Sequence, residues 1–279
     1  MFDVDEIEQV ALRAARAAGR IHLRWLNKTR TTRKSNALDL VTEADKEAEA
    51  GIIATIHRAF PDHAILAEES GASEHQSEHR WIIDPLDGTT NFAHGFPAFC
   101  VSIAYEYRGH MQYGVVFDAL HKDLFTARRG KGARLNRKLI HVSKAKALAI
   151  SLLATGFAYD RRERRRFYLA FWEDMMTRVE GVRRAGSAAL DLASVACGRL
   201  DGFWEFGLKP WDVAAGSLLV AEAGGTVTNM DGSALDIAGA QILATNTRIH
   251  SEMAQVLREI RPEAERRHLE QIRLEGKTS

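Results

Sequence analysis

The stretch Trp81-Ile82-Ile83-Asp84-Pro85-Leu86-Asp87-Gly88-Thr89-Thr90-Asn91-Phe92 joins an apolar segment to two carboxylates and a Gly-Thr-Thr turn. Ile82 and Ile83 are typical of the end of a buried strand. Pro85 is expected to end that strand, because proline has no N–H to donate to a neighbouring strand. The chain is therefore predicted to turn here, with its acidic side chains placed at the turn.

This turn is suited to hold a metal ion and a phosphate together. Asp84 and Asp87 leave it on the same side, and the N–H groups of residues 88–90 can open a short helix whose positive end attracts a phosphate oxygen. Hard carboxylate oxygens favour Mg²⁺, whereas zinc normally recruits His or Cys. Asp-Pro and Asp-Gly also occur in plain loops, so the interpretation depends on acidic residues elsewhere in the chain.

Three further acidic segments occur, and their acids are Asp45, Glu68 with Glu69, and Asp212. Glu68 follows an apolar, strand-like run, which is a suitable place for a metal ligand. Thr42 can cap the helix that contains Asp45. Taken alone, Asp45 could serve the helix dipole and Asp212 could be the N-cap of the apolar helix that follows it.

Taken together, these segments resemble the inositol monophosphatase family. Its first signature is similar to residues 81–92 and its second to residues 211–225, and the segments at 34–45 and 68–69 also fit. Residues 184–192 and 202–211 look especially like the bacterial inositol-1-monophosphatases. The resemblance covers nearly the whole chain. It implies a mixed α and β fold, the layered α-β-α-β-α sandwich of the sugar phosphatases such as fructose bisphosphatase, with the site between two lobes.

The resemblance also implies a set of metal ligands. Glu68, Asp84 and the carbonyl of Leu86 would bind a first Mg²⁺ ion, and Asp84, Asp87 and Asp212 would bind a second. Glu68 would also help a third, weaker ion through water. Electrostatics agrees with this assignment, because four crowded carboxylates repel one another unless cations neutralise them.

The same resemblance assigns the catalytic residues. Thr89, paired with Asp45 and assisted by Glu68, would orient and deprotonate the attacking water. The phosphate would rest on the N–H groups of Gly88 and Thr89. Water attacks directly, so no covalent phosphoenzyme is needed.

Polar groups for a polyol substrate follow from the resemblance as well, and they are Asp87, Gly186, Ser187, Ala188, Glu205 and Asp212. Lys34 is similar to a basic residue on a mobile loop of the family. Without the family pattern, Glu205 could be a solvent-facing strand residue and Lys34 a solvated lysine.

Composition is compatible with a compact enzyme. The chain has 279 residues, is 46% apolar and carries a formal net charge of +1, which argues against broad nucleic-acid binding. Cys100 and Cys197 lie in apolar contexts, so buried thiols in a reducing compartment are expected. The acidic start of the chain does not resemble a signal peptide, and no apolar run is long enough to span a membrane. We therefore expect a cytoplasmic protein.

The pattern of apolar residues predicts two lobes. Residues 1–146 form an N-terminal lobe with the metal site, in which helices at 5–26 and 43–57 precede an antiparallel meander with strands at 82–83, 98–107, 112–117 and 124–128. Residues 147–279 form an α/β lobe with the substrate-binding turn and a charged, helical tail. Its predicted strands are 149–153 and 202–205, and its predicted helices are 162–179, 188–196 and 213–223.

Several weaker features were weighed against plain structural roles. The basic run 161–166 could be a nucleic-acid patch, but a solvated helix face is favoured. His75 and His79 have the spacing of metal ligands without a further ligand nearby, which favours a surface loop. Arg183 and Arg184 are predicted to anchor a homodimer interface, with a pair of exposed arginines as the alternative.

The sequence thus predicts a Mg²⁺-dependent phosphatase for inositol monophosphate or a related polyol or sugar phosphate. Histidinol phosphate, fructose bisphosphate and adenosine bisphosphate are alternative substrates with the same metal chemistry. A protein of another class, which binds RNA or a transcription partner through a basic surface on the same fold, is the second hypothesis.

Overall fold

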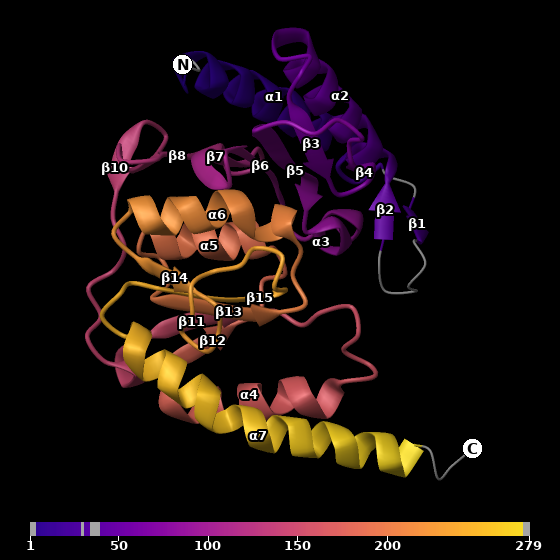
Figure 1. Ribbon diagram of the computed structural model, residues 1–279. Helices are drawn as coiled ribbons and strands as arrows, with labels where there is room; N and C mark the ends of the chain where they lie inside the picture. The colour runs from indigo at the N-terminus through magenta and orange to yellow at the C-terminus, as the bar shows by residue number, and fades with distance from the viewer. Residues whose placement is uncertain (1–3, 29–30, 34–39, 276–279) are drawn as a thin grey trace.

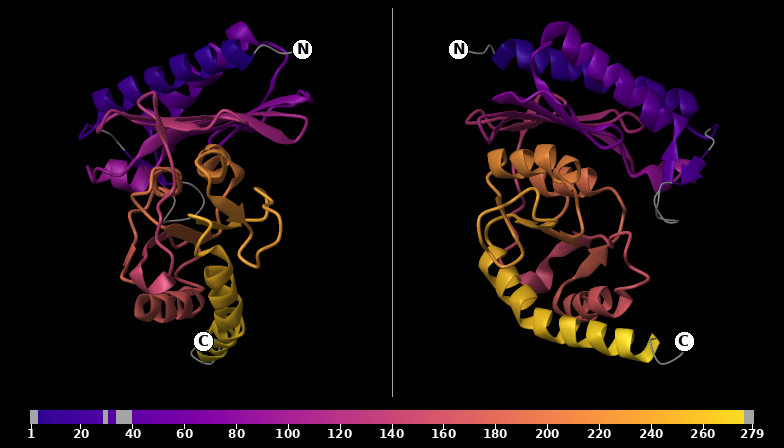
Figure 2. Two further views of the ribbon diagram at one scale, coloured as in Figure 1. Left: turned by 90° about the vertical axis from the view of Figure 1, so that its left-hand side faces the viewer. Right: turned by 45° about the vertical axis from the view of Figure 1, so that its right-hand side comes forward.

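The computed structural model describes residues 4–28, 31–33 and 40–275, and within them the chain forms five alternating layers of helices and sheets (Figure 1). Helices α1 and α2 cover one face of an eight-stranded sheet, and α5 and α6 lie between this sheet and a five-stranded one. Helices α4 and α7 cover the outer face of the second sheet (Figure 2). The predicted layered sandwich is therefore confirmed.

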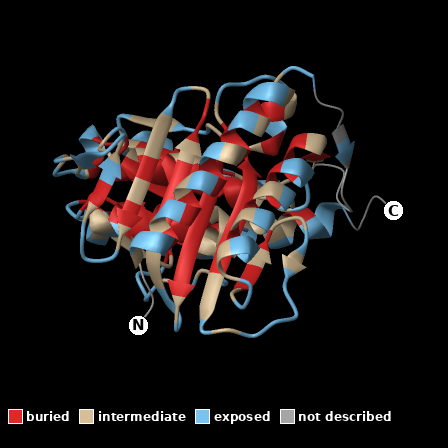
Figure 3. Ribbon diagram, turned by 90° about the horizontal axis from the view of Figure 1, so that it is seen from above, coloured by how far each residue is buried: buried red, intermediate tan, exposed pale blue. Residues whose placement is uncertain are grey.

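The first layer consists of α1 (Val4–Trp25) and α2 (Glu43–Ala59), close to the predicted helices. Small and branched apolar residues of α1, among them Val10 and Ala14, are buried against the sheet, while its outer face is exposed (Figure 3). Helix α2 begins as predicted, because Thr42 and Asp45 form a capping box. A short two-stranded sheet of β1 (Thr31–Arg33) and β2 (Leu40–Thr42) precedes it.

The eight-stranded sheet has the order β10-β9-β8-β7-β6-β5-β3-β4. Its strands are β3 (Ala64–Ala67), β4 (Gly71–Ala72), β5 (His79–Asp87), β6 (Cys100–Tyr107), β7 (His110–Asp118), β8 (Asp123–Arg128), β9 (Ala133–Leu135) and β10 (Lys138–Ile140). All neighbours are antiparallel except β3 and β5, which are parallel. The predicted meander of β6, β7 and β8 is present.

Strand β5 differs from the prediction, because it continues through Pro85 to Asp87. The pairing with β6 shifts between Asp84 and Asp87, which is a β-bulge. Proline is tolerated at a bulge, since the residues there do not pair with the neighbouring strand. As predicted, a short helix, α3 (Thr89–Ala93), follows directly.

The central layer consists of α5 (Ala188–Ala196) and α6 (Pro210–Glu222). The five-stranded sheet beneath it has the order β12-β11-β13-β15-β14, with the first three strands parallel and the last two pairings antiparallel. Its strands are β11 (Leu152–Thr155), β12 (Gly181–Arg183), β13 (Gly202–Phe206), β14 (Thr226–Thr228) and β15 (Gln241–Thr245). Apolar residues of α5 and α6 join both sheets in one core cluster.

The outer layer consists of α4 (Arg165–Arg178) and α7 (His250–Glu275). Helix α7 contains Pro262 in its interior. Two predicted boundaries between residues 147 and 165 were wrong. Residues 148–150 form a 3₁₀ turn in place of the start of a strand, and residues 162–164 form a turn before α4. None of the helices in the described ranges is long and apolar enough to cross a membrane.

Candidate active site

A pocket of about 320 Å³ collects most of the predicted site residues. It is lined by Glu68, Asp84, Leu86, Asp87, Gly88, Thr89, Thr90, Asn91, Phe157, Ala158, Tyr159, Arg161, Arg184, Gly186, Ala188, Glu205, Gly207, Leu208, Lys209, Trp211 and Asp212. These residues come from the turn after β3, β5, α3, the loop before α4, the turn before α5 with the first residue of that helix, β13, the loop after β13 and the start of α6. Two predicted site residues, Asp45 and Ser187, lie behind the pocket wall.

The bulge in β5 presents Asp84 to the pocket. Asp84 Oδ1 accepts a hydrogen bond from the N–H of Leu86 at 3.0 Å, which fixes the carboxylate against its own turn. Glu68 follows β3, the parallel neighbour of β5, and its N–H donates to the carbonyl of Ile83 at 3.1 Å. Strand pairing therefore brings these two carboxylates to the same edge.

Asp87 is held by the start of α5. Its Oδ2 accepts hydrogen bonds from the hydroxyl of Ser187 at 2.6 Å and from the N–H of Ala189 at 2.8 Å. Ser187 is buried, and its hydroxyl faces Asp87 rather than the space for a substrate. Gly186 and Ala188 line the pocket, so the predicted substrate-binding turn approaches it through those two residues.

Asp212 occupies the third position of α6, because the helix begins at Pro210 with Lys209 as its N-cap. Its Oδ2 accepts a hydrogen bond from the N–H of Lys209 at 2.6 Å. The helix thus starts earlier than the predicted Val213, and the alternative interpretation of Asp212 as the N-cap was wrong. A proline in the first turn and an acid at the third position are both favourable there.

Burial and mutual repulsion disfavour the charged forms of these acids. The pKa of Asp84 is raised well above its ordinary range by burial and by the charges of Glu68, Asp87 and Asp212. Burial and the charge of Asp87 likewise raise the pKa of Asp212. Burial raises the pKa of Asp87 to about 6, although the hydrogen bonds from Ser187 and Ala189 oppose the shift.

The chemistry of these donors fits divalent cations. All are hard oxygens, and positive charge among them would relieve the repulsion that raises their pKa values. In the described part of the chain, no three acidic, imidazole or thiol side chains are already gathered around one point as a ligand set.

Thr89 connects the pocket to Asp45. Its hydroxyl lies 3.0 Å from Asp45 Oδ1 and 3.0 Å from the carbonyl oxygen of Leu86, and its single proton can be donated to only one of them at a time. Thr42 donates to Asp45 Oδ2 through its N–H at 2.7 Å and its hydroxyl at 2.5 Å. Burial raises the pKa of Asp45 to about 6, and these hydrogen bonds oppose the shift.

Glu205 is buried in β13, so the alternative of a solvent-facing strand residue was wrong. Burial and the charge of Asp191 raise its pKa to about 8, while Arg184 opposes the shift. A Cβ atom at Gly156 would lie 2.0 Å from its Oε1. Residue 156 can therefore only be glycine if Glu205 is to keep this position.

Several pocket residues were not predicted from the sequence. Arg161 lines the pocket, so its assignment to a solvated helix face was wrong. Arg184, predicted for a dimer interface, also lines the pocket, and its guanidinium lies over the ring of Phe157 at 5.9 Å from the centroid. The amide of Asn91 donates to the carbonyls of Ala98 and Ala185, which ties α3 to the turn before α5. No short-range spacing indicated these contacts.

Two other predictions concern residues outside the pocket. Lys34 lies outside the described residues. His75 is in an exposed segment as predicted, whereas His79 is the first residue of β5, and its ring stacks on His63 with 4.5 Å between the centroids. The surface-loop interpretation therefore holds for His75 but was wrong for His79.

Comparison with known proteins gives the same family over almost the whole chain. Residues 3–262 match the inositol monophosphatase family. The chain is 49% identical to an inositol-1-monophosphatase of Synechocystis over 251 residues, which cover 89% of this chain and 88% of that protein. It is 46% identical to a protein of Pseudomonas aeruginosa named Nus factor SuhB, over 86% of this chain and 91% of that protein.

Solved structures share the fold. An inositol monophosphatase from Anabaena superposes with a TM-score of 0.85 at 48% identity, over 92% of this chain and 97% of that one. Two more distant neighbours carry ligands. An inositol monophosphatase and NADP phosphatase, 26% identical with a TM-score of 0.80, was solved with Mg²⁺ and phosphate over 90% of this chain and 95% of that one. A staphylococcal inositol monophosphatase was solved as an inhibitory complex soaked in LiCl. It is 25% identical with a TM-score of 0.81, and the match covers 92% of this chain and 96% of that one.

The family match, the identities and the superposition agree with the acidic pocket at the bulge of β5. They cover both sheets and every segment that contributes to the pocket. The chain belongs to the inositol monophosphatase family.

Proposed function

We propose that this protein is a Mg²⁺-dependent phosphomonoesterase that hydrolyses inositol monophosphate or a related polyol or sugar phosphate. The observation that carries the proposal is the meeting of Glu68, Asp84, Asp87 and Asp212 in one pocket with Thr89. These residues come from separate parts of the chain, and no structural need of the fold explains why two buried acids, Asp84 and Asp87, share a pocket with the half-buried Glu68 and Asp212. The Mg²⁺ and phosphate complex of the distant neighbour supports the choice of cation.

The cations would be held by Glu68, Asp84, Asp87 and Asp212, with the carbonyl of Leu86. When bound, Mg²⁺ would make water a better nucleophile and offset negative charge on the phosphate and the leaving oxygen. Main-chain hydrogen bonds already fix one oxygen each of Asp84, Asp87 and Asp212. The acids are thus oriented by the backbone before any ligand binds.

The proton of the attacking water would pass toward Thr89 and Asp45. The hydroxyl of Thr89 can accept a hydrogen bond from water while it donates to Asp45, which lies at hydrogen-bond distance. The raised pKa of Asp45 suits a group that takes up a proton near neutral pH. Glu68, which lines the same pocket, would assist, as the family resemblance implies.

The phosphate and the polyol parts of the substrate would contact different walls of the pocket. The N–H groups of Gly88 and Thr89 open α3 and would bind phosphate oxygens. Gly88 has a φ of 92°, and a Cβ atom there would lie 2.7 Å from the carbonyl oxygen of Ala98, so a glycine is required. Glu205, Gly186, Ala188, Asp87 and Asp212 would contact the hydroxyl groups, with Ser187 acting through Asp87.

Phosphate release by the purified protein tests this proposal. Inositol 1-phosphate should be hydrolysed with Mg²⁺ and not with EDTA, and a panel with histidinol phosphate, fructose bisphosphate and adenosine bisphosphate would rank the alternatives. Li⁺ should inhibit, which the inhibitory staphylococcal complex supports, and the family resemblance implies an uncompetitive or mixed mode. Absence of phosphate release from every substrate of the panel would overturn the proposal.

Binding of RNA or a transcription partner is the second candidate, favoured by the relatives named Nus factor SuhB. The basic run that could serve it is partly neutralised, because Arg164 pairs with Asp160 and Arg165 with Glu275. Co-purification with RNA or with a large partner, set against phosphate release with Mg²⁺, separates the two functions. We also propose a homodimer in the cytoplasm, for which light scattering at micromolar concentration is the direct test of mass.

A further inference from the structure

The loop at residues 157–164 forms one wall of the pocket, through Phe157, Ala158, Tyr159 and Arg161. It contributes no carboxylate to the pocket. The guanidinium of Arg184 lies over the ring of Phe157, and Gly156 adjoins the carboxylate of Glu205, so the loop borders the wall that is proposed to contact the hydroxyl groups of the substrate. The loop ends where α4 begins, so whatever fixes the start of α4 also fixes this wall.

Helix α4 lacks a local cap. Its N-cap is Arg164, whose side chain makes no capping hydrogen bond, and its first turn contains no acidic residue. The first N–H groups of a helix have no partner within the helix, and positive charge at this end is unfavourable. The sequence around residue 164 therefore does not explain why the helix starts there.

The missing cap comes from α7. Gln271 is only 1% exposed, and its Oε1 accepts a hydrogen bond from the N–H of Arg166 at 3.2 Å. Its Nε2 lies within hydrogen-bond distance of the carbonyls of Glu163 at 2.8 Å and Arg162 at 3.3 Å and of Glu275 Oε1 at 3.2 Å, and its two protons can serve two of these acceptors at a time. One buried amide thus binds a donor of α4 and the backbone of the loop that leads to Arg161.

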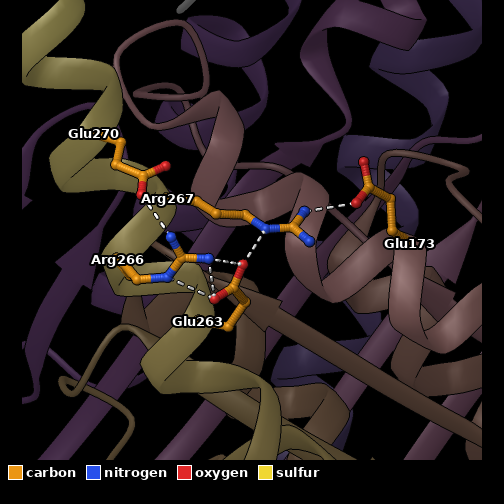
Figure 4. Close-up of polar contacts among 5 residues, drawn as sticks. All are labelled: Glu173, Glu263, Arg266, Arg267 and Glu270. Atoms are coloured by element: carbon orange, nitrogen blue, oxygen red, sulfur yellow. Dashed lines mark hydrogen bonds and ion pairs between the residues drawn. The ribbon is translucent and has the colours of Figure 1, made fainter.

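An ion pair also joins α4 to α7, and further pairs lie along α7 itself (Figure 4). Arg267 lies between Glu173 of α4, at 2.6 Å, and Glu263 of α7, at 2.8 Å. Arg266 pairs with Glu263 and Glu270 on the exposed face of α7. Exposed pairs of this kind contribute little, so we assign the fixed geometry to the buried Gln271.

We propose that the turns of α7 after Pro262 clamp the loop 157–164 against the pocket, and that Gln271 is a positioning residue for the leaving group of the substrate. These turns lie beyond the residues that match the family, which end at Pro262. The proposal rests on the phosphatase function. Loss of the amide would free the carbonyls of Arg162 and Glu163 and thereby move Arg161, their neighbour in the chain.

The variant Gln271→Met tests the clamp, because methionine has a similar length but no hydrogen-bonding amide. Glu270→Gln is the matched control, since it removes an exposed ion pair from the same turn of α7. Amide hydrogen exchange in peptides covering 157–168 should become about tenfold faster in Gln271→Met and stay unchanged in the control. Unchanged exchange in Gln271→Met would overturn the clamp.

Kinetics test the positioning role. In Gln271→Met, KM for inositol 1-phosphate should rise roughly three- to tenfold with kcat within about twofold of wild type, and inhibition by inorganic phosphate should be unchanged. Faster exchange with an unchanged KM would overturn positioning. If Gln271→Met fails to fold, Gln271→Glu serves instead, because it keeps the acceptor for Arg166 and loses the donor for both carbonyls. A wild-type protein without phosphatase activity would defeat the proposed function, while hydrogen exchange would still decide the clamp.

Discussion

At the scale of single residues, the acids of the pocket combine a fixed orientation with an unfavourable charge. The main chain donates a hydrogen bond to one oxygen of Asp84, of Asp87 and of Asp212. The same residues have raised pKa values because they are buried and close to one another. These three acids are therefore oriented as the proposed cation site requires, and without cations they do not stabilise the fold.

The substitution Asp212→Asn should abolish turnover and preserve the fold. Asparagine keeps an acceptor for the N–H of Lys209, but it removes a charge that the proposed second cation requires. We expect kcat to fall by about a thousandfold or more at saturating Mg²⁺, with an unchanged circular dichroism spectrum. Activity within about tenfold of wild type would contradict the assignment of Asp212 as a metal ligand.

The substitution Gly156→Ala should disturb Glu205 through a steric clash. The new Cβ atom would meet the Glu205 carboxylate at 2.0 to 2.1 Å, so the side chain must move. We expect KM for inositol 1-phosphate to rise about tenfold while the carboxylates of β5 keep their places. Gly51→Ala is the control, because its nearest neighbour would be Ile21 Cδ1 at 3.8 Å and alanine favours a helix interior by about 1 kcal/mol. Equal kinetics for the two variants would rule out a role for Glu205 in binding.

At the scale of elements, α1 supports the bulge of β5 through one buried histidine. His22 Nε2 lies 2.8 Å from the carbonyl oxygen of Pro85 and donates to it, and the ring packs against both Phe92 and Phe99, with 6.0 and 6.1 Å between the ring centroids. Burial lowers the pKa of His22 to about 4, although the Pro85 carbonyl and Asp118 oppose the shift. Protonation of His22 is therefore expected to weaken the contact between α1 and the bulge of β5.

The contribution of His22 to stability should fall as the pH falls from about 6.5 to 4, whereas burial raises the pKa of Asp45 and of Asp87 to about 6 and gives these acids the opposite effect in the same window. In this window the unfolded chain binds a proton at His22 and the folded protein does not, so unfolding is favoured as pH falls. The contribution is fully present above 6.5, the ordinary pKa of histidine, and amounts to roughly 3 kcal/mol. Urea unfolding at a series of pH values measures it.

The variant His22→Gln isolates this effect. Glutamine can still donate to Pro85 but does not titrate, so the free energy of unfolding should depend less steeply on pH. His63, whose pKa is also lowered to about 4 by burial and by His79, titrates in both proteins and cancels in the difference. The same pH dependence in the variant and the wild type would show that His22 is not the titrating group.

At the scale of the whole molecule, the pocket is built from residues of three different layers. Asp84 and Asp87 belong to the eight-stranded sheet, Asp212 to α6 in the central layer and Glu205 to the five-stranded sheet. Repulsion among these acids acts across the interfaces between layers. Cations bound there should therefore stabilise the entire fold and not only one loop.

Mg²⁺ should raise the melting temperature, with or without substrate. At ten times its dissociation constant, binding adds about 1.4 kcal/mol, which corresponds to a rise of roughly 3–6 °C for a chain of this size. In Asp212→Asn the rise should be smaller, and the melting temperature in EDTA should be at least that of wild type, because one repulsive charge is gone. Differential scanning calorimetry measures both. A wild-type melting temperature independent of Mg²⁺ would contradict the proposed cation site.

Local signals in the sequence were sufficient for much of the fold. Thr42 and Asp45 lie three residues apart and form the capping box that starts α2. The Gly-Thr-Thr turn opens α3, and α5 covers the predicted residues 188–196. Caps, turns and apolar periodicity act between neighbours in the chain, so their physical basis is visible in the sequence. The family resemblance added the proposed set of metal ligands, since no spacing links Asp84 to Asp212.

Only the tertiary structure decided which distant groups meet. Ser187 binds Asp87 across 100 residues, and Gln271 caps α4 across 105 residues. Arg161 lines the pocket although its neighbours in sequence are typical of a solvated surface. The sequence by itself determined the elements and the acids, because their signals are local. The roles of Ser187, Gln271 and Arg161 depend on how the layers pack, since a hydrogen bond between distant segments forms only where packing brings its donor and acceptor together.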